Sequence, residues 1–168
     1  KYGLPQYYDE NGKSSKRSIM KTPINGARLS SRYGNRKHPI LGYTKMHRGL
    51  DFAAPSGTPV FAAGDGVIEK AGWNGSYGRY IRIRHTGTYK TAYAHLSGIN
   101  KNVRIGKRVL QGKTIGYVGS SGRSTGPHLH YEFLRNNKQI NPINIKLPSG
   151  KNVPKNNILD YKRHVQKI

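Results

Sequence analysis

Two histidines, His128 and His130, stand two residues apart in the segment "TGPHLHYEF", directly after a Gly-Pro step. Residues i and i+2 of a β-strand point to the same side. If this segment is a strand, both imidazoles can hold a metal ion, or one can bind metal while the other handles a proton. The alternative is a pair of exposed histidines on a sheet surface. Glu132 follows on the same face, as a second candidate base or as a partner that orients a ligand.

A second group of chemically active side chains lies in "MHRGLDFAAPSG", where His47 and Asp51 are four residues apart. In an extended chain these two side chains also share a face. With a histidine from a distant strand they would make a three-ligand set that suits Zn²⁺ and leaves a fourth position for water. The alternative is an aspartate that ends a strand and bonds its own turn. Asp51 is one of seven acidic residues and has apolar neighbours, so a metal ion would supply the partner that its carboxylate needs.

A third candidate, His95, closes the segment "TYKTAYAH". As a histidine at the end of a strand, it would bond to the following turn. Beside a metal ion, its imidazole would orient a water molecule or stabilise an oxyanion. The pattern alone leaves both interpretations open.

Short strands joined by tight turns must position these side chains. The chain contains 21 Gly, 9 Pro and 12 Tyr, a composition typical of strands and turns. The segment "GRYIRIRH" alternates strictly, with Ile81 and Ile83 on one face, and this predicts a half-buried strand. Further strands are predicted in "TYKTAYAHLS", "KTIGYVG" and "HLHYEFL", with hairpin turns at Asp65-Gly66, across "TGT" and at Asn11-Gly12.

The predicted fold is therefore all-β, with antiparallel sheets and a short C-terminal helix. The helix is predicted because apolar residues recur at helical spacing near the end of the chain, at Ile158, Tyr161, Val165 and Ile168. We expect an extended basic lead-in over residues 1–24, the β domain over residues 25–146, and a linker with the helix over residues 147–168. A chain of 168 residues is long enough to bury a core without a disulfide or a structural metal.

The composition also restricts the function. The 30 Lys and Arg residues against 7 Asp and Glu give a net charge of +23, which attracts polyanions such as nucleic acid, anionic glycopolymers or anionic lipid. The absence of cysteine excludes disulfides, thiolate metal sites and cysteine nucleophiles. No apolar run approaches the ~20 residues of a membrane span. Because the chain begins at Lys1 without an initiator methionine, we expect a fragment or a mature form.

Taken together, "HRGLD", "AHLS" and "GPHLHYE", in this order, resemble the lysostaphin-type (LytM-domain) zinc endopeptidases of peptidoglycan. The surrounding "SRYGNRKHPILGYTKM", "GWNGSYGRYIRIRH" and "GYVGSSGRSTG" are similar to the same family, over about residues 26–142. The lead-in and the tail resemble the Gram-negative branch that acts in cell separation and wall growth. The resemblance implies a fold of the duplicated-hybrid-motif type with an open groove.

The site residues of the family carry over position by position. The resemblance implies that His47, Asp51 and His130 hold one Zn²⁺, and that His95 and His128 flank the metal-bound water and the scissile carbonyl. The water would attack the carbonyl. One of the two flanking histidines would take its proton, and the other would stabilise the oxyanion or protonate the leaving amine. All five positions are present, whereas some members of the family that lack ligands act as activators.

Other polar residues have lesser roles in this interpretation. Asn74 and Tyr77, in "GWNGSYG", would line the substrate groove. His38, in "RKHPI", would contact the substrate or block the site in a resting form. His85 and His164 are expected to be structural or solvated.

The implied substrate is the cross-linked peptide of peptidoglycan, cut between D-alanine and meso-diaminopimelate, and anionic wall polymers are further partners. The implied location is the periplasm or cell envelope, with anchoring through a region upstream of Lys1, and we expect a monomer without a membrane span. The alternative is a catalytically silent or latent module that binds the wall or activates another enzyme. A nucleic-acid binder would instead concentrate cations and aromatic rings on one sheet face, and we expect no such partner.

Overall fold

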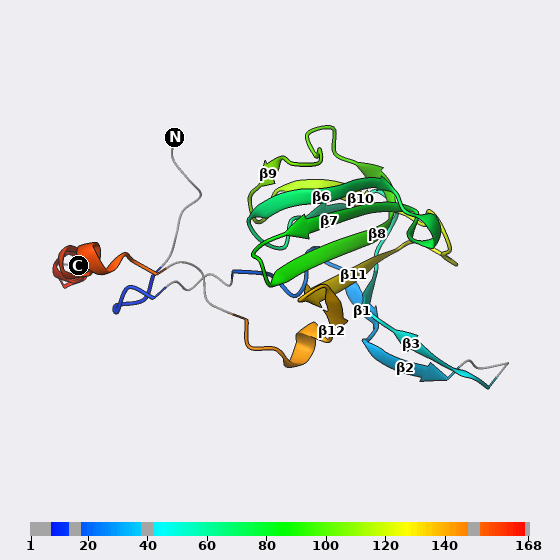
Figure 1. Ribbon diagram of the computed structural model, residues 1–168, viewed down its shortest axis with the longest axis horizontal. Helices are drawn as coiled ribbons and strands as arrows, with labels where there is room; N and C mark the ends of the chain where they lie inside the picture. Colours follow the sequence, from blue (N-terminus) through cyan, green and yellow to red (C-terminus); the bar gives the residue numbers. More distant parts are fainter. Residues whose placement is uncertain (1–7, 14–17, 38–41, 148–151, 167–168) are drawn as a thin grey trace. The chain divides into compact units, whose positions relative to one another are not determined.

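The computed structural model describes residues 8–13, 18–37, 42–147 and 152–166, and it divides the chain into two compact units (Figure 1). One unit comprises Lys1–Met20 and Lys146–Ile168, and the other comprises Lys21–Ile145. The larger unit carries the strands, and the smaller one carries the helix α1 (Ile158–Val165). Within the described ranges, no helix has both the length and the apolar character needed to cross a membrane.

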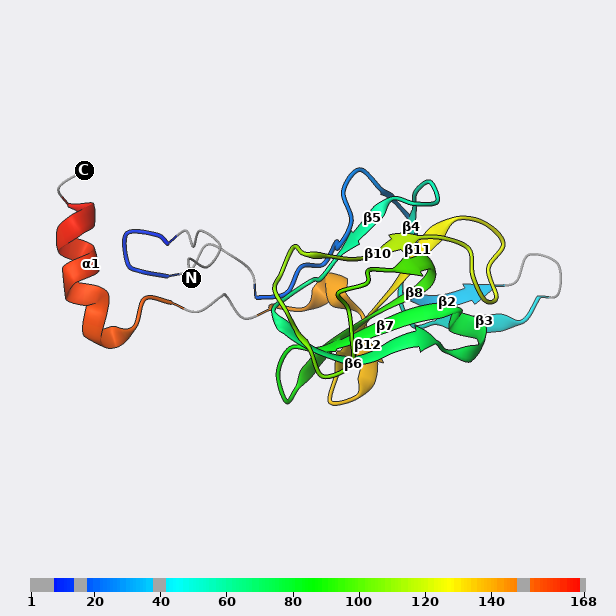
Figure 2. The same cartoon turned by 90° about the horizontal axis from the view of Figure 1, so that it is seen from above.

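An antiparallel sheet forms the body of the larger unit (Figures 1 and 2). In spatial order its strands are β1 (Arg28–Ser31), β4 (Leu50–Ala53), β11 (His128–Arg135), β8 (Tyr89–Ile99), β7 (Arg79–Arg84), β6 (Gly66–Trp73) and β9 (Arg108–Val109). The strands off this row are β10 (Thr114–Val118), which pairs with β8 and with β5 (Pro59–Phe61), and β12 (Lys138–Ile140), which pairs with β11. A separate hairpin consists of β2 (Gly34–Lys37) and β3 (Thr44–His47).

These pairings confirm the predicted class, an all-β fold of antiparallel strands with one short helix near the C-terminus. Short 3-10 turns complete the chain: η1 (Gly75–Tyr77), η2 (Pro142–Asn144) and η3 (Lys155–Asn157). The predicted hairpin between β7 and β8 is present, with Arg84 opposite Lys90. Strands β10 and β11 also lie where the sequence predicts them.

Alternation along the strands separates a buried face from the face that carries the histidines. On β11, Leu129, Tyr131 and Phe133 are fully buried, while His130 and Glu132 point to the opposite side. Strand β8 belongs to two parts of the sheet, because its first residues pair with β7 and β11 and its last residues pair with β10. The buried hydrophobic core of the sheet includes Val60, Ile81, Ile83, Tyr93, Leu96, Ile115 and Val118.

The prediction of a hairpin at Asp65-Gly66 is wrong. Strand β5 pairs with β10, and β6 pairs with β7 and β9, so the two strands on either side of this turn do not pair with each other. The Asp65 carboxylate instead accepts a hydrogen bond from the backbone N–H of Gln111 (2.7 Å), far along the chain. The pairing of β5 with β10 therefore overrides the local turn signal. Asp65 lies where the chain passes from β5 to β6, and its carboxylate bonds to the backbone at Gln111.

In the smaller unit, the turn predicted at Asn11-Gly12 is present and packs on α1. The Gly12 N–H donates to the carbonyl of Asp9 (2.9 Å), and Gly12 adopts a φ of 74°. The hydroxyl of Tyr161, on α1, donates to the carbonyl of Asp9 (3.1 Å). A Cβ atom at position 12 would collide with the side chain of Ile158, so both the backbone angle and the close approach require glycine.

His85, predicted to be structural or solvated, bonds at both ring nitrogens. Its Nδ1–H donates to the carbonyl of Asp65 (2.8 Å), and its Nε2 accepts from the hydroxyl of Thr91 (2.7 Å). Burial lowers the pKa of His85, although the hydrogen bond to Asp65 opposes this effect. The folded protein therefore holds this histidine neutral, in a structural role.

This environment predicts a pH-dependent stability. Below the unfolded-state pKa of about 6.5, the unfolded chain binds a proton at His85 more readily than the folded chain, so stability decreases as the pH falls. We expect the free energy of unfolding of the wild type to decrease more steeply than that of His85→Gln between pH 7.5 and 5, by at most about 1.4 kcal/mol per pH unit. Urea unfolding at each pH measures the difference, and parallel pH profiles would contradict the assignment.

Candidate metal centre

Three side chains from different strands bring their donor atoms together on the face of the sheet opposite Leu129, Tyr131 and Phe133. Asp51 on β4 lies directly opposite His130 on β11, and His47 ends β3. The Nε2 atom of His47 lies 3.1 Å from Oδ1 of Asp51 and 3.2 Å from Nδ1 of His130, and the last two atoms are 2.9 Å apart. The three side chains are only 11–14% exposed.

This donor set fits a zinc ion. Bonds of about 2.0–2.1 Å in a tetrahedral site separate neighbouring donor atoms by about 3.3 Å, close to the separations seen here. Two imidazoles and one carboxylate with a fourth open position are the composition of a catalytic rather than a structural zinc site. These residues are the His/Asp/Glu group that could hold a metal ion within the described part of the chain.

Hydrogen bonds on the far side of each ring select the nitrogen that faces the centre. The Nδ1 of His47 lies 2.8 Å from the carbonyl oxygen of Arg32, which can only accept, so Nδ1 carries the proton and Nε2 is free for a metal. The opposite holds for His130, where Nε2 lies 3.1 Å from a carboxylate oxygen of Glu132 and Nδ1 faces Asp51. Both rings are therefore oriented before any ion binds.

The charges of the centre are strongly coupled. Burial opposes ionisation of Asp51, but hydrogen bonds from His130 and His47 outweigh it and hold the pKa of this carboxyl well below its usual range. Burial also opposes the charged form of His130, yet its bonds to Asp51 and Glu132 raise its pKa to about 9. Arg36 pairs with the outer oxygen of Asp51 at 3.0 Å. A dication that binds here therefore meets an ionised carboxylate and displaces a proton from His130.

The other two predicted histidines lie beside this centre. The ring of His95 is 4.9 Å from that of His128 and 5.9 Å from that of His130, measured between centroids. Nε2 of His128 lies 3.9 Å from Oδ1 of Asp51. The structure thus brings together all five residues that the sequence singles out, at the position where β4, β8 and β11 are neighbours.

One loop, residues 119–127, fixes the tautomer of both flanking histidines. Nδ1 of His95 lies 2.8 Å from the carbonyl oxygen of Ser121, and Nδ1 of His128 lies 2.8 Å from that of Gly126. Since a carbonyl only accepts, each Nδ1 carries a proton, and in a neutral ring Nε2 is then the nitrogen with the lone pair. Burial lowers the pKa of His95, and the neighbouring His128 adds to this effect. Its Nε2 is therefore a competent proton acceptor near neutral pH.

His95 reaches this site through an irregularity in its strand. We expected it at the end of a strand, but β8 continues past it to Ile99. In unbroken alternation His95 would share the core face with Thr91 and Tyr93. Instead it adopts a φ of 59°, a left-handed angle that is rare for residues other than glycine, and this turns its side chain toward the metal centre.

A matched pair of substitutions measures the strain. Neither His95→Gly nor His95→Ala retains the imidazole, but only glycine is unstrained at this backbone angle. We expect His95→Gly to be more stable than His95→Ala by about 1–2 kcal/mol. Chemical unfolding of the two variants provides the comparison, and an alanine variant of equal or greater stability would show that the angle is not strained.

Comparison with known proteins identifies the family. The sequence model of peptidase family M23 matches residues 45–142, a range that contains the three candidate ligands and both flanking histidines. The chain belongs to this family. The predicted resemblance to the lysostaphin-type enzymes is thereby confirmed.

Relatives of this M23 chain include a peptidoglycan DD-endopeptidase and solved peptidase structures. It is 48% identical over 148 residues to the peptidoglycan DD-endopeptidase ShyC of Vibrio cholerae, covering 88% of this chain and 34% of ShyC. A solved zinc-containing peptidase from Vibrio cholerae superimposes with a TM-score of 0.73 and 37% identity, covering 85% of this chain and 44% of that one. The catalytic domain of lysostaphin from Staphylococcus simulans gives a TM-score of 0.61 at 36% identity, with coverage of 71% and 91%. The chain thus spans about a third of the length of ShyC.

The remaining predicted residues of the M23 domain have different surroundings. The Tyr77 hydroxyl donates to Glu132 (2.7 Å), and its ring centroid lies 5.9 Å from that of His130, so this half-buried side chain contacts the site itself. Asn74 precedes η1 without a capping hydrogen bond from its side chain. His38 lies outside the described residues. His164 is exposed on α1 in the smaller unit.

Sequence reasoning missed several contributors to the site. The carbonyl groups of Arg32, Ser121 and Gly126 orient three imidazoles, but a backbone acceptor has no residue-type signal. Arg36, which pairs with Asp51, also stands in no recognisable pattern. Gly49 was detectable in principle, because it lies between two candidate ligands in "HRGLD". A Cβ atom there would lie 2.6 Å from Cε1 of His130, so the ring requires glycine.

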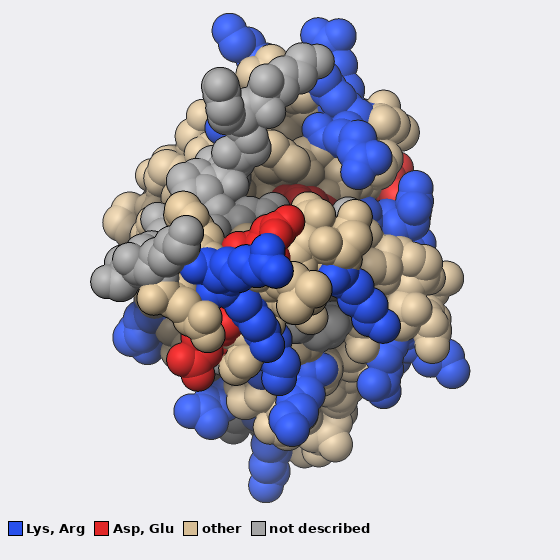
Figure 3. Space-filling view, turned by 90° about the vertical axis from the view of Figure 1, so that its left-hand side faces the viewer, with Lys and Arg blue, Asp and Glu red and all other residues tan. Residues whose placement is uncertain are grey.

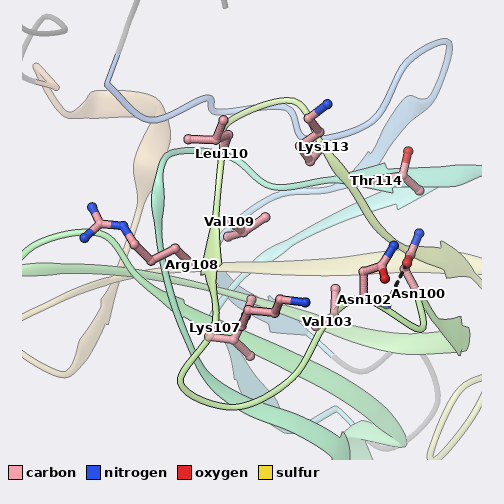
Figure 4. Close-up of a pocket in the computed structure, with 10 residues that line it drawn as sticks. Asn100, Asn102, Val103, Lys107, Arg108, Val109, Leu110, Lys113 and Thr114 are labelled. Carbon is pink, nitrogen blue, oxygen red and sulfur yellow. Dashed lines mark hydrogen bonds between the residues drawn. The ribbon is translucent and has the colours of Figure 1, made fainter. Parts of the chain in front are cut away.

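A cavity of about 480 Å³ lies at the opposite edge of the sheet, between β6 and the segment of residues 100–114 (Figure 4). Apolar side chains such as Val103 and Val109 line it together with the cationic Lys107. None of its lining residues is a histidine or an acid. This cavity therefore offers no imidazole or carboxylate, in contrast to the centre on β4 and β11.

Proposed function

We propose that this chain is the catalytic domain of a zinc-dependent endopeptidase that hydrolyses peptide cross-links of bacterial peptidoglycan. The observation that carries the proposal is the convergence of His47, Asp51 and His130 beside two further histidines whose Nε2 atoms are free. The names of relatives such as ShyC supply the substrate class. The catalytic domain in this proposal spans residues 25–146.

In this mechanism, His47 through Nε2, Asp51 through Oδ1 and His130 through Nδ1 would hold one zinc ion. When bound, zinc supplies polarisation of a carbonyl group and a lowered pKa for a water molecule. His95 and His128 contact the reacting atoms through Nε2. One of them accepts the proton of the attacking water, and the other donates a hydrogen bond to the oxyanion or a proton to the leaving amine. The carbonyl groups of loop 119–127 hold a proton on Nδ1 of each ring. The ring that accepts the proton of the water is therefore neutral, and the ring that donates from Nε2 is in its imidazolium form.

We propose that the bond cut is the D-alanyl–meso-diaminopimelate cross-link, outside the cytoplasm and in the periplasm. The DD-endopeptidase name of ShyC, at 48% identity, supports this choice over a glycine–glycine bond. Lys and Arg side chains are spread over the face shown in Figure 3, with few acidic side chains between them. This field attracts the carboxylates of wall peptides and the anionic wall polymers, an effect that salt weakens.

Two substrates offered in parallel test the proposal. One is a purified peptide dimer joined by the D-alanyl–meso-diaminopimelate bond, and the other is a pentaglycine peptide. We expect the zinc-loaded chain to cleave only the first, and a chelator to stop the reaction until zinc is restored. Cleavage of pentaglycine would overturn the proposed bond, and cleavage of neither substrate would overturn the proposed activity of this chain.

A further inference from the structure

A buried carboxylate lies behind the ring of His130, on the side away from the other ligands. Glu132 follows two residues later on the same face of β11 and is 2% exposed. Its Oε1 atom lies 3.1 Å from Nε2 of His130, while Nδ1 of the same ring lies 2.9 Å from Asp51. The imidazole is therefore held at both nitrogens, and each contact requires a particular orientation of the ring.

Further donors hold the Glu132 carboxylate in place. The Tyr77 hydroxyl donates to Oε1 (2.7 Å), and the side-chain amide of Gln139 donates to Oε2 (3.3 Å). Burial of a carboxylate is costly unless hydrogen bonds compensate it, and here three side chains from separate elements do so. The carboxylate is thus a fixed acceptor for the Nε2–H of His130.

Tyr77 is itself held by the loop that orients the flanking histidines. It ends η1, and the carbonyl of Ser76 in the same turn accepts a hydrogen bond from the backbone N–H of Arg123 (2.8 Å). Gly78 and Gly122 approach so closely that a Cβ atom at either position would collide with the other segment. The loop that bonds to His95 through Ser121 therefore also supports Tyr77.

We propose that Glu132, held by Tyr77 and Gln139, is a positioning residue that keeps the proton of His130 on Nε2 and presents Nδ1 to the metal. This inference deepens the proposed function, because it rests on zinc binding at His47, Asp51 and His130. It also assigns Glu132 a role other than general base. The side chain is almost fully buried, and it lies on the opposite side of the His130 ring from Asp51.

The test is the zinc dissociation constant, measured by competition with a chromophoric chelator. We expect Glu132→Ala to bind zinc about 10- to 100-fold more weakly than the wild type. Glu132→Gln, which keeps an oxygen acceptor, should recover most of the affinity, and Tyr77→Phe should show a smaller loss than Glu132→Ala. Glu69→Ala is the matched control, because it removes a carboxylate that pairs with Arg82 and Lys90 instead. Unchanged affinity in both Glu132 variants would overturn the proposal.

A spectroscopic measurement keeps the test valid if Glu132→Ala fails to fold. Long-range ¹H–¹⁵N spectra of the zinc-loaded wild type should show His130 protonated at Nε2, with a strongly hydrogen-bonded proton. Tyr77→Phe and Glu132→Gln should shift this resonance, whereas Glu69→Ala should not. A His130 protonated at Nδ1 would overturn the inference. Because neither readout uses cleavage, a wild type that binds zinc as expected but cuts no cross-link would refute the proposed function alone.

Discussion

Replacing His128 with alanine is expected to slow cross-link cleavage by about 10²- to 10⁴-fold while zinc remains bound. The reason is geometric. Nε2 of His128 has a free lone pair beside Asp51, and Nδ1 is occupied by the carbonyl of Gly126, so the side chain is placed for proton transfer at Nε2. His95→Ala should have an effect of the same order, because Ser121 orients that ring in the same way.

Kinetics with a cross-linked dimer and zinc analysis of the same samples test this prediction together. The control is His164→Ala, which removes an exposed histidine of α1 in the other unit. The dependence of the cleavage rate on pH distinguishes the proton acceptor from the oxyanion donor. Loss of the proton acceptor should remove the decrease in rate at low pH, whereas loss of the oxyanion donor should leave that decrease in place. A His128→Ala enzyme that retains full activity would refute the catalytic role, and one that loses its zinc would assign His128 to the metal.

Substituting Asp51 with asparagine is expected to abolish stoichiometric zinc binding and all cleavage that depends on it. The change preserves the shape of the side chain and removes the only acidic group among the three candidate ligands. It also leaves the positive charges of Arg36 and His130 without the carboxylate that they contact. Since loss of a residue that merely supports a ligand costs about 10- to 100-fold in affinity, loss of this ligand should cost more.

Elemental analysis of zinc after dialysis measures this effect directly. Asp160→Asn is the matched control, because Asp160 lies on α1 with a side chain that is 83% exposed. Asp51→Asn should contain no zinc after dialysis, and Asp160→Asn should retain one equivalent. Retention of zinc by Asp51→Asn would mean that the metal is held elsewhere in the chain.

Much of the site follows from strand alternation. The pattern "HLHYEF" predicts that His130 and Glu132 share a face, and the structure confirms it. The sequence does not reveal that the two histidines of this segment use different nitrogens. That difference depends on their partners, since Gly126 holds Nδ1 of His128 and Glu132 holds Nε2 of His130.

Other features depend on the tertiary structure and could not be predicted. Alternation along β8 would turn His95 into the core, and only its left-handed backbone angle places it beside the other histidines. The turn at Asp65-Gly66 has the local chemistry of a hairpin, but β5 finds its partner in β10, about fifty residues later. In the second case, pairing with a distant strand decides the outcome, and a local pattern carries no information about it.

The most direct test of the central claim is mass spectrometry of purified peptidoglycan peptide dimers after incubation with this chain. Three samples are needed: the zinc-loaded chain, the chelated chain, and the zinc-loaded His128→Ala variant. The proposed function predicts that only the first converts dimers to monomers, with the new amino group on meso-diaminopimelate. Dimers that survive in all three samples, or cleavage that persists after zinc is removed, would contradict a zinc-dependent endopeptidase centred on His47, Asp51 and His130.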